Sequence, residues 1–322
     1  MRITVTGGAG YIGSHVVSLL IDHGFDVVVI DDLSTGFPER IPDVALVALD
    51  LANTQSRDEL IHALAGCDAV IHFAGRKRVD ESVERPSWYY QQNVGGMANL
   101  LLAMESASIN NIVFSSSAAV YGSSEGQRIA EETPTKPINP YGNTKLIGER
   151  MLTDVAAQKE FNAASLRYFN VAGAGKPTLG DSAVLNLIPM VFERIDTNKA
   201  PLIFGADYPT RDGTCIRDFI HVADLADAHI TALKKILSGS LTGHRVFNIG
   251  TGQGSSVREV IATIQAVSGI TREPEIRNRR QGDPALVVGD PSRAHNELGW
   301  TSKRDLYEIV RSAWESHVLA RK

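Results

Sequence analysis

Short β-branched runs alternate with longer helical patterns along the first half of the chain. The runs occupy residues 3–6, 27–30, 45–49, 69–73, 111–115 and 164–168, and the helical patterns occupy 13–23, 54–65, 87–107 and 141–158. This alternation is typical of a parallel sheet with helices on both faces. The sequence therefore predicts an α/β fold built on a Rossmann-type, doubly wound parallel sheet.

The pattern changes after about residue 171, where segments containing Gly and Pro replace the regular alternation. We expect a smaller C-terminal α/β domain there. One strand, at residues 218–222, and the helical pattern at 224–237 are predicted to return to the first domain. The predicted domains are therefore 1–172 plus about 218–248, and 173–217 plus about 249–322.

Spaced glycines follow the first predicted strand and precede the first predicted helix. Gly7, Gly10 and Gly13 allow a tight turn, a close approach of the backbone to a pyrophosphate, and a helix N-terminus directed at its charge. The second run ends at Asp31, whose carboxylate can accept hydrogen bonds from ribose hydroxyls and would repel a 2′-phosphate. A dinucleotide site that prefers NAD to NADP is predicted; the alternative is a glycine turn in an unrelated α/β domain.

Composition and charge indicate which partners and which cellular compartment to expect. The net charge of −5 and the absence of a basic run argue against nucleic acid, and the nine histidines show no metal-binding spacing. Two cysteines, Cys67 and Cys215, make a disulfide framework unexpected. The chain shows no signal-like segment and no apolar stretch near the ~18 residues of a membrane span. We expect a cytoplasmic protein with no membrane partner and no metal.

A second motif supplies candidate chemistry. The strand at 111–115 leads into Ser115, Ser116 and Ser117, and Tyr141 and Lys145 follow with the spacing Y-x-x-x-K. Residues four apart share one face of a helix, and a nearby ammonium favours a phenolate. The pattern predicts a Tyr141 proton carrier assisted by Lys145, with a serine holding the substrate oxygen. An exposed tyrosine–lysine pair on a helix is the alternative.

These motifs carry a resemblance to a known family. The chain resembles the extended short-chain dehydrogenase/reductases and, within them, the UDP-galactose 4-epimerases. The resemblance runs nearly end to end through the blocks VTGGAGYIGSH, IHFAG, FSSSAAVYG, PYGNTK, LRYFNVAGA, RDFIHV and RRQGD. It implies an isomerase that oxidises C4 of a UDP-hexose transiently, with tightly bound NAD and a UDP-sugar-binding second domain. Sugar-nucleotide dehydratases are disfavoured, because Ala118 and Ala119 follow Ser117 where an Asp-Glu pair would stand.

The resemblance also implies site residues. The catalytic residues would be Ser117, Tyr141 and Lys145. The residues that contact NAD would be Gly7, Gly10, Tyr11, Ile12, Gly13, Asp31, Asp32, Leu33, Ser34, Asp50, Leu51, Phe73, Ala74, Gly75, Lys77, Gln92, Asn93, Tyr141, Lys145 and Phe169. The residues that contact the UDP-sugar would be Lys77, Ser117, Tyr141, Asn170, Asn186, Leu187, Ile203, Phe204, Arg217, Val257, Arg280, Asp283 and Val287.

Some positions depart from the family pattern. Gln92 stands where an asparagine is usual, and the segment between Asp31 and Asp50 is shorter than is common, which puts the contacts of residues 33–36 in question. Val287 stands where members restricted to UDP-glucose and UDP-galactose often carry tyrosine. A smaller side chain would admit an N-acetyl group, so activity on UDP-GlcNAc and UDP-GalNAc is also expected; the alternative is that Val287 merely continues its strand.

Three further interpretations stay open or rest on the family alone. The enzyme could instead be a UDP-N-acetylglucosamine or UDP-pentose 4-epimerase. A nucleotide-sensing Rossmann module without catalysis is the alternative outside enzymes. The apolar helical patterns at 87–107 and 141–158 match those that the family pairs in a four-helix interface, so a C2 homodimer is expected.

Overall fold

A computed structural model describes residues 1–123, 128–158, 160–280 and 282–321, and it divides into two compact units. The first unit contains residues 1–122, 134–167 and 226–247, and the second contains residues 123–133, 168–225 and 248–322, apart from the undescribed residues. Gln281, part of the RRQGD block, lies outside the described residues.

The first unit is built on a sheet of seven strands among the described residues. The strands, in sheet order, are β10 (His244–Ile249), β6 (Asn162–Tyr168), β5 (Asn111–Ser117), β4 (Ala69–His72), β1 (Arg2–Thr6), β2 (Asp26–Asp31) and β3 (Ala45–Ala48). β1 pairs in parallel with β2 on one side and β4 on the other, and β2–β3 and β4–β5 are also parallel. The predicted doubly wound parallel sheet is confirmed. Its strand order reverses at β1 and β4, which is where such folds bind ligands.

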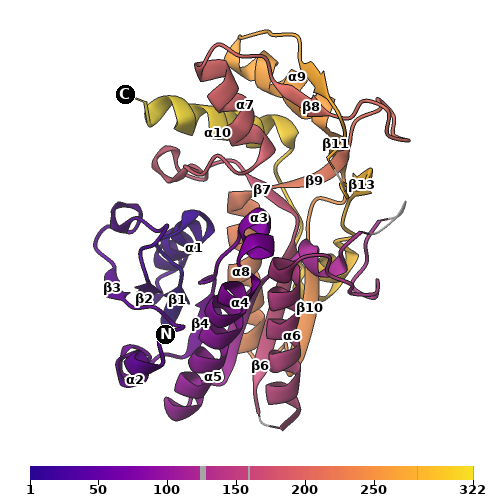
Figure 1. The fold of residues 1–322 in the computed structure, drawn as a ribbon. Coiled ribbons are helices and arrows are strands. Elements are labelled where there is room, and N and C mark those ends of the chain that lie inside the picture. Colours follow the sequence, from indigo (N-terminus) through magenta and orange to yellow (C-terminus); the bar gives the residue numbers. More distant parts are fainter. Residues whose placement is uncertain (124–127, 159, 281, 322) are drawn as a thin grey trace. The chain divides into compact units, whose positions relative to one another are not determined.

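Helices cover both faces of this sheet (Figure 1). They are α1 (Tyr11–Asp22), α2 (Arg57–Ala63), α3 (Val79–Glu84), α4 (Pro86–Tyr89), α5 (Gly96–Ser106), α6 (Pro140–Gln158) and α8 (Val222–Leu237). A π-helical turn, η3 (Tyr90–Gly95), joins α4 to α5, so the pattern at 87–107 is one nearly continuous helical run. Short 3-10 turns are η1 (Pro38–Arg40), η2 (Thr54–Ser56) and η4 (Ala118–Tyr121).

The second unit has a smaller mixed sheet centred on β9 (Ile216–His221). β9 pairs with β7 (Asn170–Ala172), β11 (Gly254–Ser256) and β13 (Leu286–Val287), while β8 (Leu202–Phe204) pairs with β12 (Glu275–Arg277). The helices are α7 (Leu187–Asp196), α9 (Val257–Ser268) and α10 (Leu306–Leu319), with the shorter turns η5 (Pro177–Leu179) and η6 (Ala294–Leu298).

One strand lies in a different sheet from the one predicted. Residues 218–222 were expected to return to the first domain, but β9 pairs only within the second sheet. The buried Asp218 carboxylate explains this placement, because it accepts hydrogen bonds from backbone N–H groups of Thr251, Gly252 and Gly289 in the same unit. The elements that do return are α8, from Ala226 onward, and β10.

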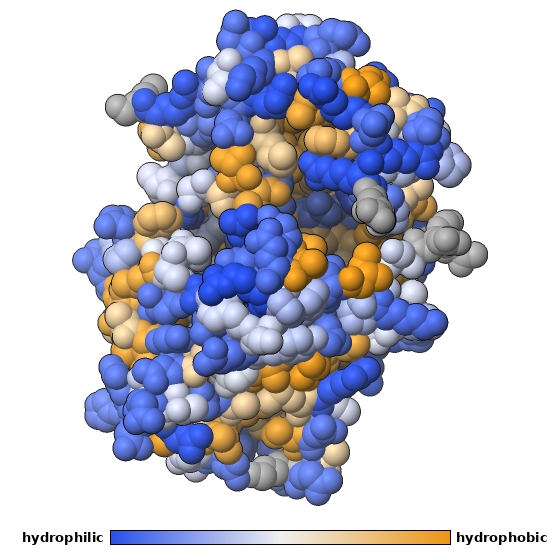
Figure 2. All heavy atoms as spheres, in the orientation of Figure 1, coloured by the Kyte–Doolittle hydropathy of each residue, from blue (hydrophilic) through white to orange (hydrophobic). Residues whose placement is uncertain are grey.

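Each unit has its own apolar core. In the first, Leu60, Leu100, Met104, Ile112 and Leu152 are among the buried side chains between the sheet and its helices. The core of the second is formed by side chains from α7, α9, α10 and β9, including Phe192, Phe219, Ile261 and Val310. Figure 2 shows mostly hydrophilic side chains on the drawn face, with apolar ones exposed in small groups. In the described part of the chain, no helix is long and apolar enough to cross a membrane.

Candidate active site

The glycine turn after β1 packs tightly against its surroundings. Gly7 has φ +71°, and a Cβ on Gly7 would lie 2.6 Å from the Ala74 nitrogen. A Cβ on Gly13 would lie 2.2 Å from the Gly7 carbonyl oxygen. α1 therefore begins directly at the turn, and its N-cap, Gly10, offers no side chain to cap the first-turn N–H groups. The helix N-terminus is thus open to an anion, which fits the pyrophosphate of a dinucleotide.

Asp31 lies at the end of β2 beside this turn. Its carboxylate accepts hydrogen bonds from the N–H groups of Ala9 (3.0 Å) and Leu33 (2.9 Å). Burial raises the pKa of Asp31, while these two hydrogen bonds oppose that rise. The chain then turns back over the glycine turn, since the Phe37 N–H donates to the Ala9 carbonyl at 3.0 Å. The short segment after Asp31 is thus ordered by the turn itself.

Arg76 was not predicted as a site residue. Its side chain connects the segment that follows β2 to η3. The Arg76 guanidinium forms an ion pair with Asp32 at 2.6 Å, donates to the Ser34 hydroxyl, and donates to the Gln92 amide oxygen at 2.9 and 3.1 Å. It also lies 5.2 Å from the centre of the Trp88 ring. Burial raises the pKa of Asp32, but the hydrogen bonds of Ser34 and the charge of Arg76 outweigh burial and lower it.

The other residues predicted near this turn have different surroundings. Lys77, next to Arg76, is exposed. Asn93 accepts from the Arg76 N–H at 2.7 Å and donates to the Thr144 hydroxyl at 3.0 Å. Asp50 accepts from the Ala52 N–H, and Leu51 is buried in the core. Gln92 uses its amide oxygen for Arg76, so the departure from the family pattern at this position has a partner within the chain.

The serine and Y-x-x-x-K motifs meet in the first unit, where α6 packs on β5. Asn139 caps α6 by accepting from the Gly142 N–H at 2.8 Å, and Pro140 begins the helix. The Ser117 hydroxyl hydrogen-bonds to the Tyr141 phenol. The Lys145 ammonium donates to the Ser115 carbonyl oxygen at 2.8 Å. The three predicted catalytic residues are thus brought together.

Burial dominates the electrostatics of this cluster. Tyr141 is 9% exposed and Lys145 is 6% exposed. Burial raises the pKa of Tyr141, although the hydrogen bond from Ser117 lowers it in part. Burial lowers the pKa of Lys145 to about 8. Lys145 was expected to lower the pKa of Tyr141; in the structure the lowering contribution comes from the hydrogen bond of Ser117.

The second unit contains a pocket of about 290 Å³. Its lining includes eight of the predicted UDP-sugar contacts, namely Asn170, Asn186, Leu187, Phe204, Arg217, Val257, Arg280 and Asp283. Five predicted contacts are absent from this lining: Lys77, Ser117 and Tyr141, which belong to the first unit, and Ile203 and Val287. Ile203 is buried in the core, and Val287 is half-buried in β13, in register with Arg217 of β9. Phe169 is also in this unit, where its ring closely approaches the backbone of Gly289.

The two predicted arginines of the pocket differ in their partners. Arg217 forms an ion pair with Asp283 and donates to the Ile216 carbonyl oxygen at 2.8 Å. Arg280 lies 4.0 Å from the centre of the Phe204 ring and has no carboxylate partner among the described residues. A stacked guanidinium without a counter-ion is suited to bind a diphosphate.

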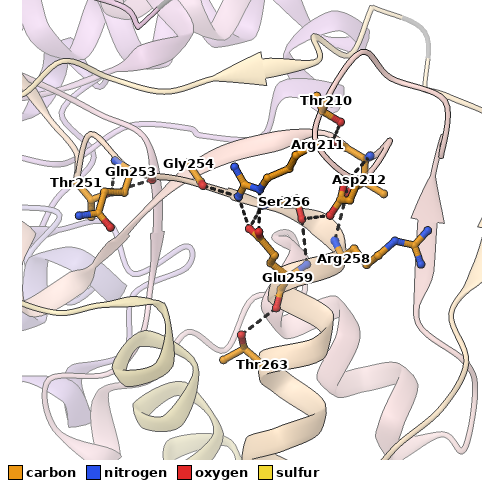
Figure 3. Close-up of polar contacts among 11 residues, drawn as sticks. Thr210, Arg211, Asp212, Thr251, Gln253, Gly254, Ser256, Arg258, Glu259 and Thr263 are labelled. Atoms are coloured by element: carbon orange, nitrogen blue, oxygen red, sulfur yellow. Dashed lines mark hydrogen bonds and ion pairs between the residues drawn. The ribbon is translucent and has the colours of Figure 1, made fainter.

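A polar network orders the segment that contributes Val257 to the pocket (Figure 3). Arg211 forms an ion pair with Glu259 and donates to the Gly254 carbonyl oxygen at 2.8 Å. Asp212 accepts from the Ser256 hydroxyl, and Ser256 and Glu259 form a capping box at the start of α9. The network therefore holds β11 and the first turn of α9 together. Among the described residues, no cluster of His, Cys, Asp or Glu could hold a metal ion.

Comparisons with known proteins agree with this geometry. Residues 3–250 match the family described as the NAD dependent epimerase/dehydratase family. The chain belongs to this family. The UDP-glucose 4-epimerase of Azospirillum brasilense is 47% identical over 98% of this chain and 92% of its own length.

Solved structures of family members are also similar. A UDP-glucose 4-epimerase from Stenotrophomonas maltophila, with bound NAD and formylated UDP-arabinopyranose, has a TM-score of 0.94 at 37% identity, covering 100% of this chain and 99% of the other. One from Bifidobacterium longum, in complex with NAD+ and UDP, has a TM-score of 0.90 at 37% identity with the same coverage. As an epimerase/dehydratase family member, the chain has a close likeness to enzymes that bind both ligands.

Proposed function

We propose that this family member interconverts UDP-glucose and UDP-galactose by inverting C4 of the hexose through a transient 4-keto sugar. The observation that carries the proposal is the cluster of Ser117, Tyr141 and Lys145 on β5 and α6. A buried phenol hydrogen-bonded to a serine, with an ammonium four residues along the same helix face, is suited to take and return one proton. The likeness to UDP-glucose 4-epimerases solved with NAD and UDP supports it.

The two units divide the binding tasks. The first unit holds NAD through the glycine turn, Asp31 and the residues around Arg76, and the second holds UDP in its pocket. Arg280 neutralises the diphosphate, Arg217 donates to it while paired with Asp283, and the amides of Asn170 and Asn186 offer hydrogen bonds to the sugar and nucleotide. When bound, NAD supplies the hydride acceptor and, later in the same turnover, the hydride donor. Apart from the placement of β9, the domain boundaries predicted from the sequence remain part of this proposal.

The chain's own residues manage the proton. Tyr141 accepts the proton of the 4-hydroxyl group, and Ser117 orients that oxygen by a hydrogen bond. Lys145 lies on the same face of α6 as Tyr141, and its positive charge is proposed to favour the phenolate in addition to the hydrogen bond of Ser117. The flat 4-keto group then presents its other face, and Tyr141 returns the proton to give the inverted alcohol. No net oxidation occurs, so the cofactor is not consumed.

The experiment that tests this function uses purified protein without added NAD. We expect conversion of UDP-galactose to UDP-glucose, followed by NMR of the sugar anomeric signals. Parallel incubations with UDP-GalNAc and UDP-arabinose separate the alternatives, because a UDP-N-acetylglucosamine or UDP-pentose 4-epimerase would convert only its own substrate. Binding of NAD and UDP without any conversion would support a nucleotide-sensing module and contradict the proposal.

We also propose that the protein works as a C2 homodimer in the cytoplasm. The support for the dimer is the apolar surface of α5, where Leu102 is 45% exposed, and the half-buried Ile147 and Met151 on α6. The family commonly pairs these two helices with their copies. Light scattering at micromolar concentration should give twice the 34.9 kDa of one chain; the mass of a single chain would contradict it.

A further inference from the structure

Three consecutive serines of β5 each contact a different turn of α6. The Ser117 hydroxyl bonds to Tyr141, the Ser115 carbonyl oxygen accepts from Lys145, and the Ser116 hydroxyl donates to Glu149 at 2.5 Å. Tyr141, Lys145 and Glu149 are spaced four residues apart, so they share one face of the helix. The third member of this series, Glu149, has no part in the mechanism described above.

Glu149 belongs to a buried ion pair. Arg167 of β6 donates from Nε to Glu149 Oε1 at 2.8 Å and from Nη2 to Oε2 at 2.6 Å, and both side chains are nearly inaccessible. Arg167 also donates to the Tyr121 hydroxyl at 2.9 Å. A buried ion pair is weak evidence for a contribution to stability, because desolvation offsets the attraction. Its position on the helix face that carries Tyr141 and Lys145 points to another role.

The helix that carries these groups is closely docked. A Cβ on Gly148 would lie 2.8 Å from the Phe114 ring, so the α6 backbone packs directly against this side chain of β5. Lys145 Nζ lies 5.0 Å from the centre of the same ring. The bonds of Glu149 to Ser116 and Arg167 lie one helical turn beyond Lys145, so they hold α6 on β5 and β6 in the register in which Lys145 reaches Ser115.

Among the described residues, few charged groups face Lys145. His72 of β4 and His244 of β10 are buried, and burial lowers their pKa values to about 3 and about 4, so both are neutral during catalysis. From η4, Tyr121 presents a hydroxyl bonded to Arg167. α3 and α4 also pack on α6, and their Glu81 accepts a hydrogen bond from the Tyr89 hydroxyl. Of the charged groups in this part of the described chain, Glu149 is the one whose charge raises the pKa of Lys145.

We propose that Glu149 is a positioning residue that keeps Lys145 protonated and in register beside Tyr141. The role rests on the proposed function, since it concerns the charge that makes the phenol a proton acceptor. Burial lowers the pKa of Lys145 to about 8, and the negative charge of Glu149 opposes that lowering. Without Glu149, Lys145 loses its proton at a lower pH, and the phenolate of Tyr141 loses its stabilising cation.

The test compares pH profiles of kcat for the NAD-bound protein. In Glu149→Gln the alkaline limb should move to lower pH by about one unit, because one opposing charge is removed. Glu149→Asp keeps the charge and should restore the wild-type limb. Ser116→Ala removes a hydrogen bond to Glu149 but no charge, so its limb should coincide with wild type even if its melting temperature falls. A limb in Glu149→Gln that coincides with wild type would show that Glu149 is only structural.

Two additions keep the test decisive. If Glu149→Gln does not fold, because Arg167 is left buried without a counter-ion, Glu149→Gln/Arg167→Gln removes both charges together and should shift the limb in the same direction by a smaller amount, since the loss of the Arg167 charge offsets part of the effect. Ultraviolet difference titration of the phenolate, with Tyr141→Phe as the blank, should show a higher Tyr141 pKa in whichever of these two variants folds. An unchanged titration would overturn the inference. If the wild-type protein converts no UDP-sugar, the proposed function is overturned instead. The titration would still test whether Glu149 affects the pKa of Tyr141.

Discussion

The catalytic cluster of the first unit and the pocket of the second unit are built differently. Tyr141 and Lys145 are almost fully buried, and their polar atoms are held by hydrogen bonds to adjacent serines. The pocket is lined by partly exposed side chains, and Arg280 has no carboxylate partner among the described residues. The polar groups of the catalytic cluster are thus satisfied by hydrogen bonds within the protein. In the pocket, the Arg280 guanidinium is still available to bind a ligand. The difference implies that substitutions in the catalytic cluster mainly lower kcat, whereas substitutions in the pocket mainly weaken the binding of the UDP-sugar.

The largest effect is expected at the proton carrier. Tyr141→Phe keeps the ring but removes the hydroxyl, so kcat should fall by about 10²–10⁴-fold, as is typical for the loss of a general acid–base group. Binding of NAD and UDP, measured by calorimetry, should stay close to wild type. A kcat within a few-fold of wild type would mean that another residue carries the proton.

The choice of sugar should respond to Val287. Val287→Tyr should suppress activity on UDP-GalNAc and UDP-GlcNAc by about 10–200-fold while sparing UDP-galactose, because the phenol would occupy the space of the N-acetyl group. Val287→Ile is the matched control, since it adds little volume. Steady-state kcat/KM for both sugar pairs is the measurement. If wild type fails on UDP-GalNAc, or the tyrosine variant treats both pairs alike, Val287 is not the selective position.

Arg280, which has no carboxylate partner among the described residues, gives an affinity test. Arg280→Leu should weaken UDP binding by about 10–100-fold, because a charge-assisted contact to the diphosphate is lost. Arg279→Leu is the matched control, since Arg279 is paired with Asp207 and stacked 4.1 Å from the Tyr208 ring centre. Calorimetric titration with UDP compares them. Equal losses in both variants would contradict a specific role for Arg280.

A smaller effect is expected at Arg76, which connects the segment after β2 to η3. Arg76→Leu removes its bonds to Asp32, Ser34 and Gln92, so NAD should dissociate about tenfold faster. Arg78→Leu is the control, because Arg78 is exposed and pairs only with Asp80 among the described carboxylates. Release of NAD during gel filtration, monitored by absorbance, measures the rate. Identical release from the two variants would mean that Arg76 does not retain the cofactor.

The sequence predicted the features that local pattern determines. The strands of the first sheet follow from short β-branched runs, and Tyr141 and Lys145 follow from helical spacing beside a serine-rich strand end. Arg76 was missed because its role depends on Asp32, Ser34 and Gln92, which only the folded chain brings together. The assignment of β9 was wrong because a strand's sheet depends on distant partners such as Gly252 and Gly289, which bind the buried Asp218.

The pocket shows a similar limit. A resemblance can name its lining, but it cannot tell which arginine is neutralised. The ion pair of Arg217 with Asp283 and the stacking of Arg280 on Phe204 are tertiary contacts between segments far apart in the chain. The Glu149–Arg167 pair is likewise invisible in the sequence, because the two residues lie on different elements and neither belongs to a spaced motif.

The central claim is that C4 is oxidised and reduced within one turnover by a cofactor that stays bound. UDP-galactose carrying deuterium at C4 tests this directly when it is incubated with purified protein and no added NAD. The account predicts UDP-glucose that keeps the deuterium at C4, and unlabelled substrate in deuterated water should gain none at that carbon. Loss of the label to solvent, or product formed only when NAD is added in equal amount, would contradict it.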